Sequence, residues 1–399
     1  MRGYARQDGR RGIRNVTLVV FLVECAHHVA RQITARFPAQ EVQLIGFPGC
    51  YPSEYAQMML QRLCTHPNVG AVLLVSLGCE GFNKLALSDV VAASGRPVET
   101  VTIQGAGGTR ASIAAGVEFV ETMRAALRDT PTVDMDISDL VVGTICGGSD
   151  GASGLTSNPA IGRAFDRLVA RDAACIFEET GELIGCESHM AARAVTPELG
   201  RALEASVAKA AAYYAVLGYP SFAPGNADGG LTTIEEKSMG AYAKSGRSQI
   251  AGLIKPGDVP PTGGLYLLDV VPDGEVRFGF PNIVDTAEIV ELIACGAHMI
   301  LFSTGRGSVV GSAISPVIKV CSNSATYRRM AGDMDINAGR ILDGETTLDE
   351  VGAEIERLAV AVAEGETTCS EDLGHTEFIL TYKSFEPIGP ACLPTAAVG

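Results

Sequence analysis

The chain has 399 residues, of which 47% are hydrophobic, and its formal net charge at pH 7 is −15. This length is enough for two or three domains with a large buried core. The negative charge and the lack of a basic run argue against binding to nucleic acid or to an anionic membrane. The longest apolar stretch is far shorter than a membrane span and the N-terminus lacks the apolar core of a signal peptide, so we expect a cytoplasmic protein.

Apolar, β-branched runs alternate with amphipathic stretches in the first third of the chain. This pattern predicts strands at residues 16–24, 42–47, 71–77 and 99–103, and helices at residues 26–36, 51–64 and 111–128. Such alternation predicts an α/β fold with mostly parallel sheets flanked by helices. A polar break at residues 128–134 marks the predicted boundary between two α/β domains, residues 1–133 and 134–399.

Polar residues follow the predicted strands of the first domain, and function collects at this edge of a parallel sheet. His27 and His28 follow the first strand, where a histidine can ligate a metal, move a proton or simply cap a helix. The glycine run that ends at Arg110 follows the fourth strand. We interpret it as a second possible anion site, with Arg110 as its cation.

Eleven cysteines are scattered along the chain without a C-x-x-C pair, which excludes a zinc ribbon or a thioredoxin motif. Most are expected to be reduced and buried. Cys25, Cys79 and Cys146 each end an apolar, strand-like run, so they could gather at one sheet edge and ligate iron, including an iron–sulfur cluster. The alternative is that they are ordinary thiols at strand ends.

In the second domain, strands are predicted at residues 139–146, 173–178, 265–271 and 298–303. The first of them leads through a glycine-rich loop, residues 146–162, into a helix. Glycines allow backbone N–H groups to converge and the helix N-terminus is electropositive, so this loop is typical of an anion site, although a capped tight turn is the simpler alternative. The expected ligand is a carboxylate or a phosphate, and the expected contacts are Gly147, Gly148, Ser149, Asp150, Ser153 and Asn158.

An acidic segment, residues 178–189, follows the second of these strands and holds four carboxylates and one histidine. Oxygen ligands with one imidazole suit Fe²⁺, Mn²⁺ or Mg²⁺. We therefore predict Glu179, Glu182 and Glu187 as metal ligands. A solvated acidic helix start is the alternative.

Three cationic residues lie where surface charges are unusual. Arg306 stands between glycines directly after an apolar strand, where a guanidinium can hold a carboxylate by two hydrogen bonds. Lys319 is flanked by apolar residues, so burial could lower its pKa toward the catalytic range. Lys237 ends a glycine-rich polar segment that begins at residue 225, which we expect to be an ordered site loop.

Taken together and in order, these motifs resemble the altronate and galactarate dehydratases. The matching segments span nearly the whole chain and are residues 3–15, 66–69, 77–80, 146–154, 158–160, 225–238, 304–308 and 330–337. The resemblance implies an iron- or manganese-stimulated lyase. Such an enzyme removes water from an acidic sugar, such as altronate or galactarate, and gives a 2-keto-3-deoxy acid.

The chain departs from this family in three places. Full-length members begin with a small β-rich domain, whereas this chain opens at the motif of residues 3–6, so we expect that domain to be missing or to be a separate small subunit. The acidic segment differs in spacing, which shifts the position of His189. Ala338 stands where members tend to have cysteine. The large subunit of sulfolactate sulfo-lyase also lacks the small domain and is similar to the same scaffold, eliminating sulfite.

Both eliminations need a base for the proton next to the carboxylate, positive charge for the enediolate and an acid for the leaving group. The expected substrate contacts beyond the glycine loop are Thr304, Arg306 and Arg110. The candidates for proton transfer are Lys237, His27, His28 and Lys319. An oligomer is expected. A non-catalytic subunit that binds sugar acids is the rival hypothesis, and a nicotinamide oxidoreductase is disfavoured because residues 104–109 lack the G-x-G-x-x-G spacing.

Overall fold

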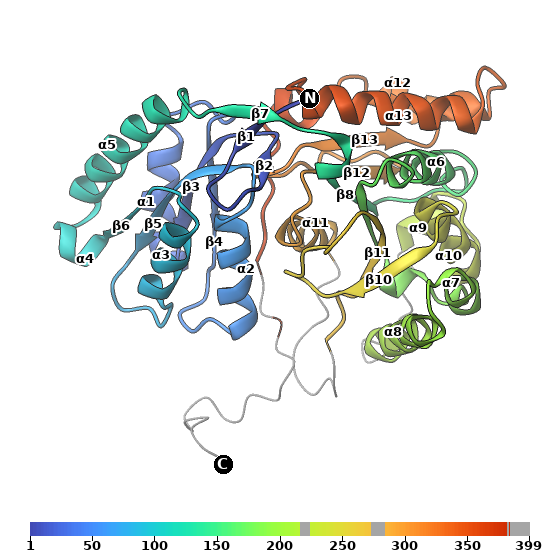
Figure 1. The fold of residues 1–399 in the computed structure, drawn as a ribbon, viewed down its shortest axis with the longest axis horizontal. Coiled ribbons are helices and arrows are strands. Elements are labelled where there is room, and N and C mark those ends of the chain that lie inside the picture. The colour runs from blue at the N-terminus through green and yellow to red at the C-terminus, as the bar shows by residue number, and fades with distance from the viewer. Residues whose placement is uncertain (216–223, 273–283, 381–382, 384–399) are drawn as a thin grey trace, which may run out of the picture.

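The computed structural model describes residues 1–215, 224–272, 284–380 and 383. It contains a four-stranded, a seven-stranded and a small three-stranded sheet. Figure 1 shows the two larger sheets in separate lobes, each with helices packed around it. The strand pairs of both larger sheets are parallel, so the predicted α/β fold with two helix-flanked sheets is confirmed.

The N-terminal lobe is built on a sheet with strand order β4-β3-β5-β6. Its strands are β3 (Val16–Phe21), β4 (Val42–Gly46), β5 (Val69–Ser76) and β6 (Val98–Thr102), as the alternating pattern predicts. Its helices are α1 (Glu24–Thr34), α2 (Glu54–Cys64), α3 (Lys84–Ala93), α4 (Ile103–Ala106) and α5 (Thr109–Leu127). Successive side chains of a strand point to opposite faces, so α1 and α5 cover one face of this sheet while α2 and α3 cover the other.

The C-terminal lobe is built on a sheet with strand order β10-β11-β9-β8-β12-β13-β14. Its strands are β8 (Val141–Cys146), β9 (Ala174–Glu178), β10 (Ile250–Ile254), β11 (Gly264–Leu268), β12 (Met299–Thr304), β13 (Val317–Cys321) and β14 (Ile336–Asn337). The prediction of β8, β9, β11 and β12 is confirmed, and the other three strands were not predicted. Because β8 and β9 are neighbours, the residues that follow them lie at one edge of the sheet.

Helices cover both faces of this second sheet. They are α6 (Ser157–Val169), α7 (Glu187–Arg193), α8 (Pro197–Ala215), α9 (Pro224–Asp228), α10 (Ile234–Tyr242), α11 (Asp285–Ala294), α12 (Ser324–Arg329), α13 (Leu348–Ala363) and α14 (Cys369–Leu373). The apolar sides of α6 and α13 pack on one face. On the other face, α11 lies between the sheet and α2, so one hydrophobic core runs through both lobes.

A small antiparallel sheet also links the start of the chain to the segment between the lobes. Strand β1 (Arg2–Ala5) pairs with β2 (Arg11–Gly12) and with β7 (Thr132–Asp134). The domain boundary predicted between residues 133 and 134 lies inside β7. This sheet was not predicted, because its strands are short and polar.

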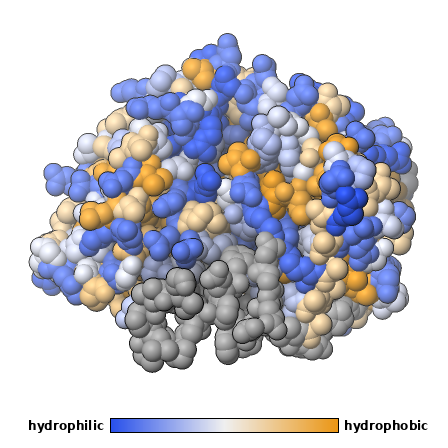
Figure 2. All heavy atoms as spheres, turned by 60° about the horizontal axis from the view of Figure 1, so that its bottom comes forward, coloured by the Kyte–Doolittle hydropathy of each residue, from blue (hydrophilic) through white to orange (hydrophobic). Residues whose placement is uncertain are grey.

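The described part of the face in Figure 2 is mainly hydrophilic, with apolar side chains in small separate groups. Scattered apolar groups of this kind are normal on a protein surface. None of the helices in the described ranges combines the length and the hydrophobicity that a membrane span requires.

Asn68 and the buried His298 form hydrogen bonds at the junction between the lobes. Asn68, just before β5, donates from Nδ2 to the carbonyl of His298 at 3.1 Å and accepts at Oδ1 from the amide of Ile13 at 2.9 Å. His298 Nδ1 lies 3.0 Å from the amide of Val141 and Nε2 lies 2.8 Å from the carbonyl of Arg11. Nδ1 therefore accepts and Nε2 donates, which is the pattern of a neutral imidazole.

We expect the folded protein to lose stability as the pH falls from about 6.5 to about 4. Burial lowers the pKa of His298 from 6.5 to about 4 and places the pKa of His66 well below 6.5. In that window the unfolded chain binds protons that the folded chain cannot, so unfolding becomes easier by roughly 3 kcal/mol for His298 alone. Urea unfolding across this pH range measures the slope. His298→Gln, whose amide can both accept and donate, should flatten it, and surface His28→Gln should leave it unchanged; an unaltered slope in His298→Gln contradicts the assignment.

Candidate active site

The glycine-rich loop between β8 and α6 satisfies most of its own amides. The amide of Gly147 donates to the carbonyl of Ser303 at 3.0 Å, and the amide of Gly151 donates to the carbonyl of Gly229 at 2.9 Å. Within the described residues, the amides of Gly148 and Ser149 have no protein acceptor. The amides of Gly148 and Ser149 are therefore open to a ligand, although most of the other amides of the loop are engaged.

Asp150 fixes this loop to its neighbours. One carboxylate oxygen accepts from the amide of Ser153 at 2.9 Å and from the hydroxyl of Ser322 at 2.7 Å, and the other accepts from Nδ2 of Asn323 at 2.7 Å. The carboxylate predicted to bind substrate is thus engaged inside the protein. Its position ties the end of β8 to the end of β13.

Asp150→Asn is expected to destabilise the protein by about 2 kcal/mol, because an amide nitrogen cannot accept the hydrogen bonds that the carboxylate oxygen takes. Urea unfolding measures the loss, and Asp129→Asn, at an exposed position, is the matched control. A variant with full stability and only a raised KM would instead assign Asp150 to substrate binding.

A buried ionic cluster lies where β8 and β9 end. The amide of Cys146 donates to Glu179 Oε1 at 2.6 Å, and the Cys146 thiol lies 3.5 Å from Glu182 Oε2. Lys237 on α10 forms an ion pair with Glu182, and Lys244 forms one with Glu179. Lys244 lies in the 3-10 turn Ala243–Ser245 that directly follows α10.

The ionisable groups of this cluster have pKa values that are shifted in different directions. Burial, and then the charge of Glu182, raises the pKa of Glu179 well above its usual range. Burial opposes the charge of Glu182, but Lys237 and a hydrogen bond from Glu179 outweigh it and lower the pKa of Glu182. The pKa of Lys237 is raised, because Glu182 outweighs the effect of burial. At neutral pH the cluster thus holds an ammonium on Lys237 and a carboxylate on Glu182.

Three further acids lie close to the cluster: Glu178 and Glu288 are buried, and Asp285 is exposed at the start of α11. Burial and Glu291 raise the pKa of Glu178 to about 8, and burial and Glu182 raise that of Asp285 to about 6. Burial and Glu178 raise the pKa of Glu288 well above its usual range. Asp285 begins α11 and lies against the glycine loop so closely that a Cβ at Gly147 would overlap its carboxylate. Gly147 is therefore required for this approach.

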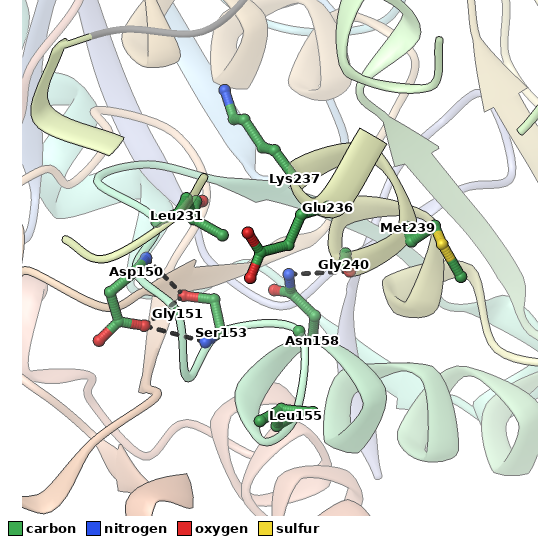
Figure 3. A pocket seen from close by; sticks show the side chains of 12 residues that line it. Asp150, Gly151, Ser153, Leu155, Asn158, Leu231, Glu236, Lys237, Met239 and Gly240 are labelled. Carbon is green, nitrogen blue, oxygen red and sulfur yellow. Dashed lines mark hydrogen bonds between the residues drawn. The ribbon is translucent and has the colours of Figure 1, made fainter. Parts of the chain in front are cut away.

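A cavity of about 320 Å³ lies between the glycine loop and α10. Figure 3 shows Asn158 in its wall, donating to the carbonyl of Gly240, with its oxygen on the side of Ser153. That oxygen is buried and has no hydrogen-bond donor among the described residues. Lys237 also lines the cavity, and its ammonium points away from the Asp150–Ser153 turn toward Glu182. The cavity thus presents an unused acceptor on Asn158 and the free amide of Ser149, and the carboxylate of Glu236 also lies in its lining.

The predicted arginine and threonine contacts hold loops together. The amide of Arg306 donates to the carbonyl of Gly148 at 2.9 Å, and its Nη1 donates to the carbonyl of Gly225 at 2.6 Å. Thr304 Oγ1 is buried and accepts from the amide of Gly307 at 3.1 Å. Arg306 therefore links the glycine loop to the segment before α10. Arg110 is exposed on α5 of the other lobe, so the structure does not bring it to this cavity.

Three of the four predicted proton-transfer residues lie outside the cluster. His27 and His28 are on α1, where His27 Nδ1 lies 2.9 Å from Glu24 and its ring stacks on Phe21. Lys319 is fully buried on β13, 3.5 Å from His375, and burial lowers its pKa. Only Lys237 lines the cavity.

The expectation that Cys25, Cys79 and Cys146 share one sheet edge is wrong. Cys25 and Cys79 follow β3 and β5 in the four-stranded sheet and are exposed, whereas Cys146 ends β8 in the other sheet and is buried. The sequence pattern marks strand ends but does not say which strands share a sheet.

One tight group of metal-ligating side chains occurs among the described residues: Cys146, Glu179 and Glu182, whose ligand atoms lie within 4.8 Å of one another. Glu187, the third predicted carboxylate, begins α7 and is outside this group. A thiol with two carboxylates suits a divalent transition metal. The raised pKa values of the surrounding acids come mainly from burial, with a smaller contribution from neighbouring carboxylates.

Two family models match the chain along its length. Residues 3–128 match the family model described as D-galactarate dehydratase/altronate hydrolase, second domain, and residues 137–385 match D-galactarate/altronate dehydratase, C-terminal. An altronate dehydratase of Bacillus subtilis is 30% identical over 92% of this chain and 74% of that protein. The (2R)-sulfolactate sulfo-lyase subunit beta of Chromohalobacter salexigens is 31% identical over 95% of this chain and 96% of that protein. A galactarate dehydratase of Escherichia coli is 32% identical over 78% of this chain and 60% of that protein.

Both family models match in order along one chain, and the glycine loop and the Lys237 segment that resemble the family lie beside one cavity. The chain therefore belongs to the D-galactarate/altronate dehydratase family and is a lyase.

Proposed function

We propose that the protein removes water from an acidic sugar such as altronate or galactarate and gives a 2-keto-3-deoxy acid. The single observation that supports this most is that Lys237, which lines the cavity beside the glycine loop, forms an ion pair with Glu182 behind it. A fixed ammonium beside a cavity is suited to an anionic substrate and to a hydroxyl leaving group.

The substrate carboxylate would accept from the free amides of Gly148 and Ser149, and a substrate hydroxyl would donate to the unused oxygen of Asn158. Two polar contacts on opposite sides of the cavity would orient the carbon chain between them. These contacts position the substrate without calling on Asp150, whose carboxylate holds the loop.

Elimination then needs a base and an acid. With a pKa of about 6, Asp285 is ionised at neutral pH yet basic enough to take the proton next to the substrate carboxylate. Lys237, held protonated by Glu182, would give its proton to the β-hydroxyl as the carbon–oxygen bond breaks, so that water leaves. The enol that remains tautomerises to the 2-keto-3-deoxy acid.

Cys146, Glu179 and Glu182 would hold Fe²⁺ or Mn²⁺, and the bound ion would supply positive charge that stabilises the enediolate. Glu182 pairs with Lys237 through one carboxylate oxygen, and its other oxygen lies 3.5 Å from the Cys146 thiol. We further propose a cytoplasmic, oligomeric enzyme.

Elimination of sulfite from sulfolactate is the second candidate. It is favoured by the end-to-end match to the sulfo-lyase subunit beta, which covers 96% of that protein. The same base, carboxylate contacts and cation serve both reactions, because only the leaving group differs. Since that relative is named as a subunit, we propose that this chain also works with a separate small subunit.

The test is an anaerobic product assay. The chain is purified with and without a candidate small subunit, supplied with Fe²⁺, and given altronate, galactarate and sulfolactate. We expect keto acid from a sugar acid without sulfite; sulfite from sulfolactate would establish the second candidate. Binding of an acid with no product under any condition would overturn the catalytic proposal in favour of a non-catalytic sugar-acid-binding subunit.

A further inference from the structure

The exposed cysteines of this chain are not scattered. Of the ten cysteines in the described residues, six are buried, Cys369 is half-buried and three are exposed: Cys25, Cys50 and Cys79. Each of the three follows a strand of the N-terminal sheet, β3, β4 and β5 respectively. These strands are neighbours in the order β4-β3-β5 and run parallel, so all three thiols lie at the same carboxyl edge.

Backbone hydrogen bonds hold the three loops side by side. The amide of Glu24, next to Cys25, donates to the carbonyl of Pro48 in the β4 loop at 3.0 Å. The amide of Gly81, two residues after Cys79, donates to the carbonyl of Cys50 at 2.8 Å. The relative positions of the three thiols are thus fixed by the fold, even though the residues come from separate parts of the sequence.

The three thiol groups are also unused by the protein. None of them makes a hydrogen bond to another residue in the part of the chain that the structure describes. Exposed free thiols are prone to oxidation, whereas the other cysteines of this chain are sheltered. Three exposed thiols without hydrogen-bond partners among the described residues, all at one sheet edge, therefore indicate a ligand-binding site.

The spacing favours a polynuclear ligand over a single ion. The three thiols do not form a group as tight as Cys146, Glu179 and Glu182, whose atoms would suit one ion. Thiolates spread over three loops match an iron–sulfur cluster, in which each cysteine binds a different iron. We propose that Cys25, Cys50 and Cys79 bind a [4Fe–4S] cluster, with one iron left free of protein thiolate and open to an oxygen ligand.

This site is separate from the cavity near Cys146, and the proposal does not depend on the proposed function. Cys25, Cys50 and Cys79 lie at an edge of the four-stranded sheet, whereas Cys146 belongs to the seven-stranded sheet. An open iron suits a water molecule or the hydroxyl and carboxylate oxygens of a hydroxy acid. Binding of the iron–sulfur cluster can be measured without any substrate.

The test is anaerobic reconstitution of the full chain with ferrous iron and sulfide. After desalting, iron, acid-labile sulfide and visible absorbance are measured. We expect about four iron and about four sulfide ions per chain. Cys25→Ser, Cys50→Ser and Cys79→Ser should each lose most of the sulfide and absorbance, and because the three side chains are exposed, circular dichroism and thermal unfolding should match the wild type.

Two controls separate the alternatives. Cys369→Ser removes a half-buried thiol elsewhere and should keep the full cluster. Cys146→Ser should also keep sulfide and absorbance, whereas a cluster held by Cys146 would be lost. Iron without sulfide in the wild type, or equal sulfide in the triple Cys25/Cys50/Cys79→Ser variant, would overturn the proposal and indicate adventitious iron.

Discussion

Replacing Glu182 with glutamine is expected to lower kcat/KM by about 10³-fold, in the range of losses seen when a group that controls proton transfer is removed. The change keeps the shape of the side chain but removes the negative charge that holds Lys237 protonated and one oxygen of the proposed metal group. Steady-state kinetics on the acid that the wild type converts measures the loss.

Two further Glu→Gln variants sharpen this result. Glu198→Gln, exposed at the start of α8, is the matched control and should keep full activity. Glu187→Gln tests whether Glu187 is a metal ligand, as the sequence predicts. The tight group in the structure does not include Glu187, so we expect only a small loss of activity. Activity of Glu182→Gln within about threefold of the wild type would remove Glu182 from the mechanism.

Lys237→Met is expected to cause a similar loss of turnover together with a loss of stability of roughly 3 kcal/mol. Lys237 and Glu182 are only 7% and 20% exposed, so removing one partner leaves a charge that water cannot fully solvate. Urea unfolding gives the stability, and product formation gives the turnover.

The double variant Lys237→Met/Glu182→Gln separates the two effects. It removes both charges, so we expect most of the stability to return while activity stays low. Lys209→Met, which breaks an ion pair with Asp269 away from the cavity, is the control for loss of a lysine. If the double variant regained activity with its stability, Lys237 would have a structural role alone.

The strands that could be predicted from sequence are those with uninterrupted apolar runs. Strand β5 is buried along its whole length, and its pattern is unambiguous. Strand β13 was missed because Lys319 interrupts its apolar run, and β10 because Gly252 lies at its centre. Strand β14 has two residues, too few for any pattern.

The candidate site was partly predictable for a related reason. Cys146, Glu179 and Glu182 stand at or just after strand ends, and Lys237 closes a glycine-rich polar segment, which marks all four as functional candidates. That they meet depends on β8 and β9 being neighbours, which local sequence does not specify. Lys244 and Asp285 lie in ordinary helical sequence, and their proximity to the cluster arises only from packing.

The cysteines also show that local sequence does not specify which strands are neighbours. Cys25 and Cys79 were correctly placed at strand ends, but Cys146 was grouped with them across two sheets. Cys50, which follows the strand beside β3, is the residue that shares their edge. Its sequence context, a proline and a glycine before it, resembles a simple turn.

The most direct test of the account is a crystal structure of the Glu182→Gln variant grown anaerobically with the acid that the wild type converts. We predict the substrate carboxylate at the amides of Gly148 and Ser149, in the cavity lined by Asn158 and Lys237. Substrate bound instead at the edge with Cys25, Cys50 and Cys79, and an empty cavity beside the glycine loop, would contradict the assignment of the elimination to the Glu182–Lys237 site.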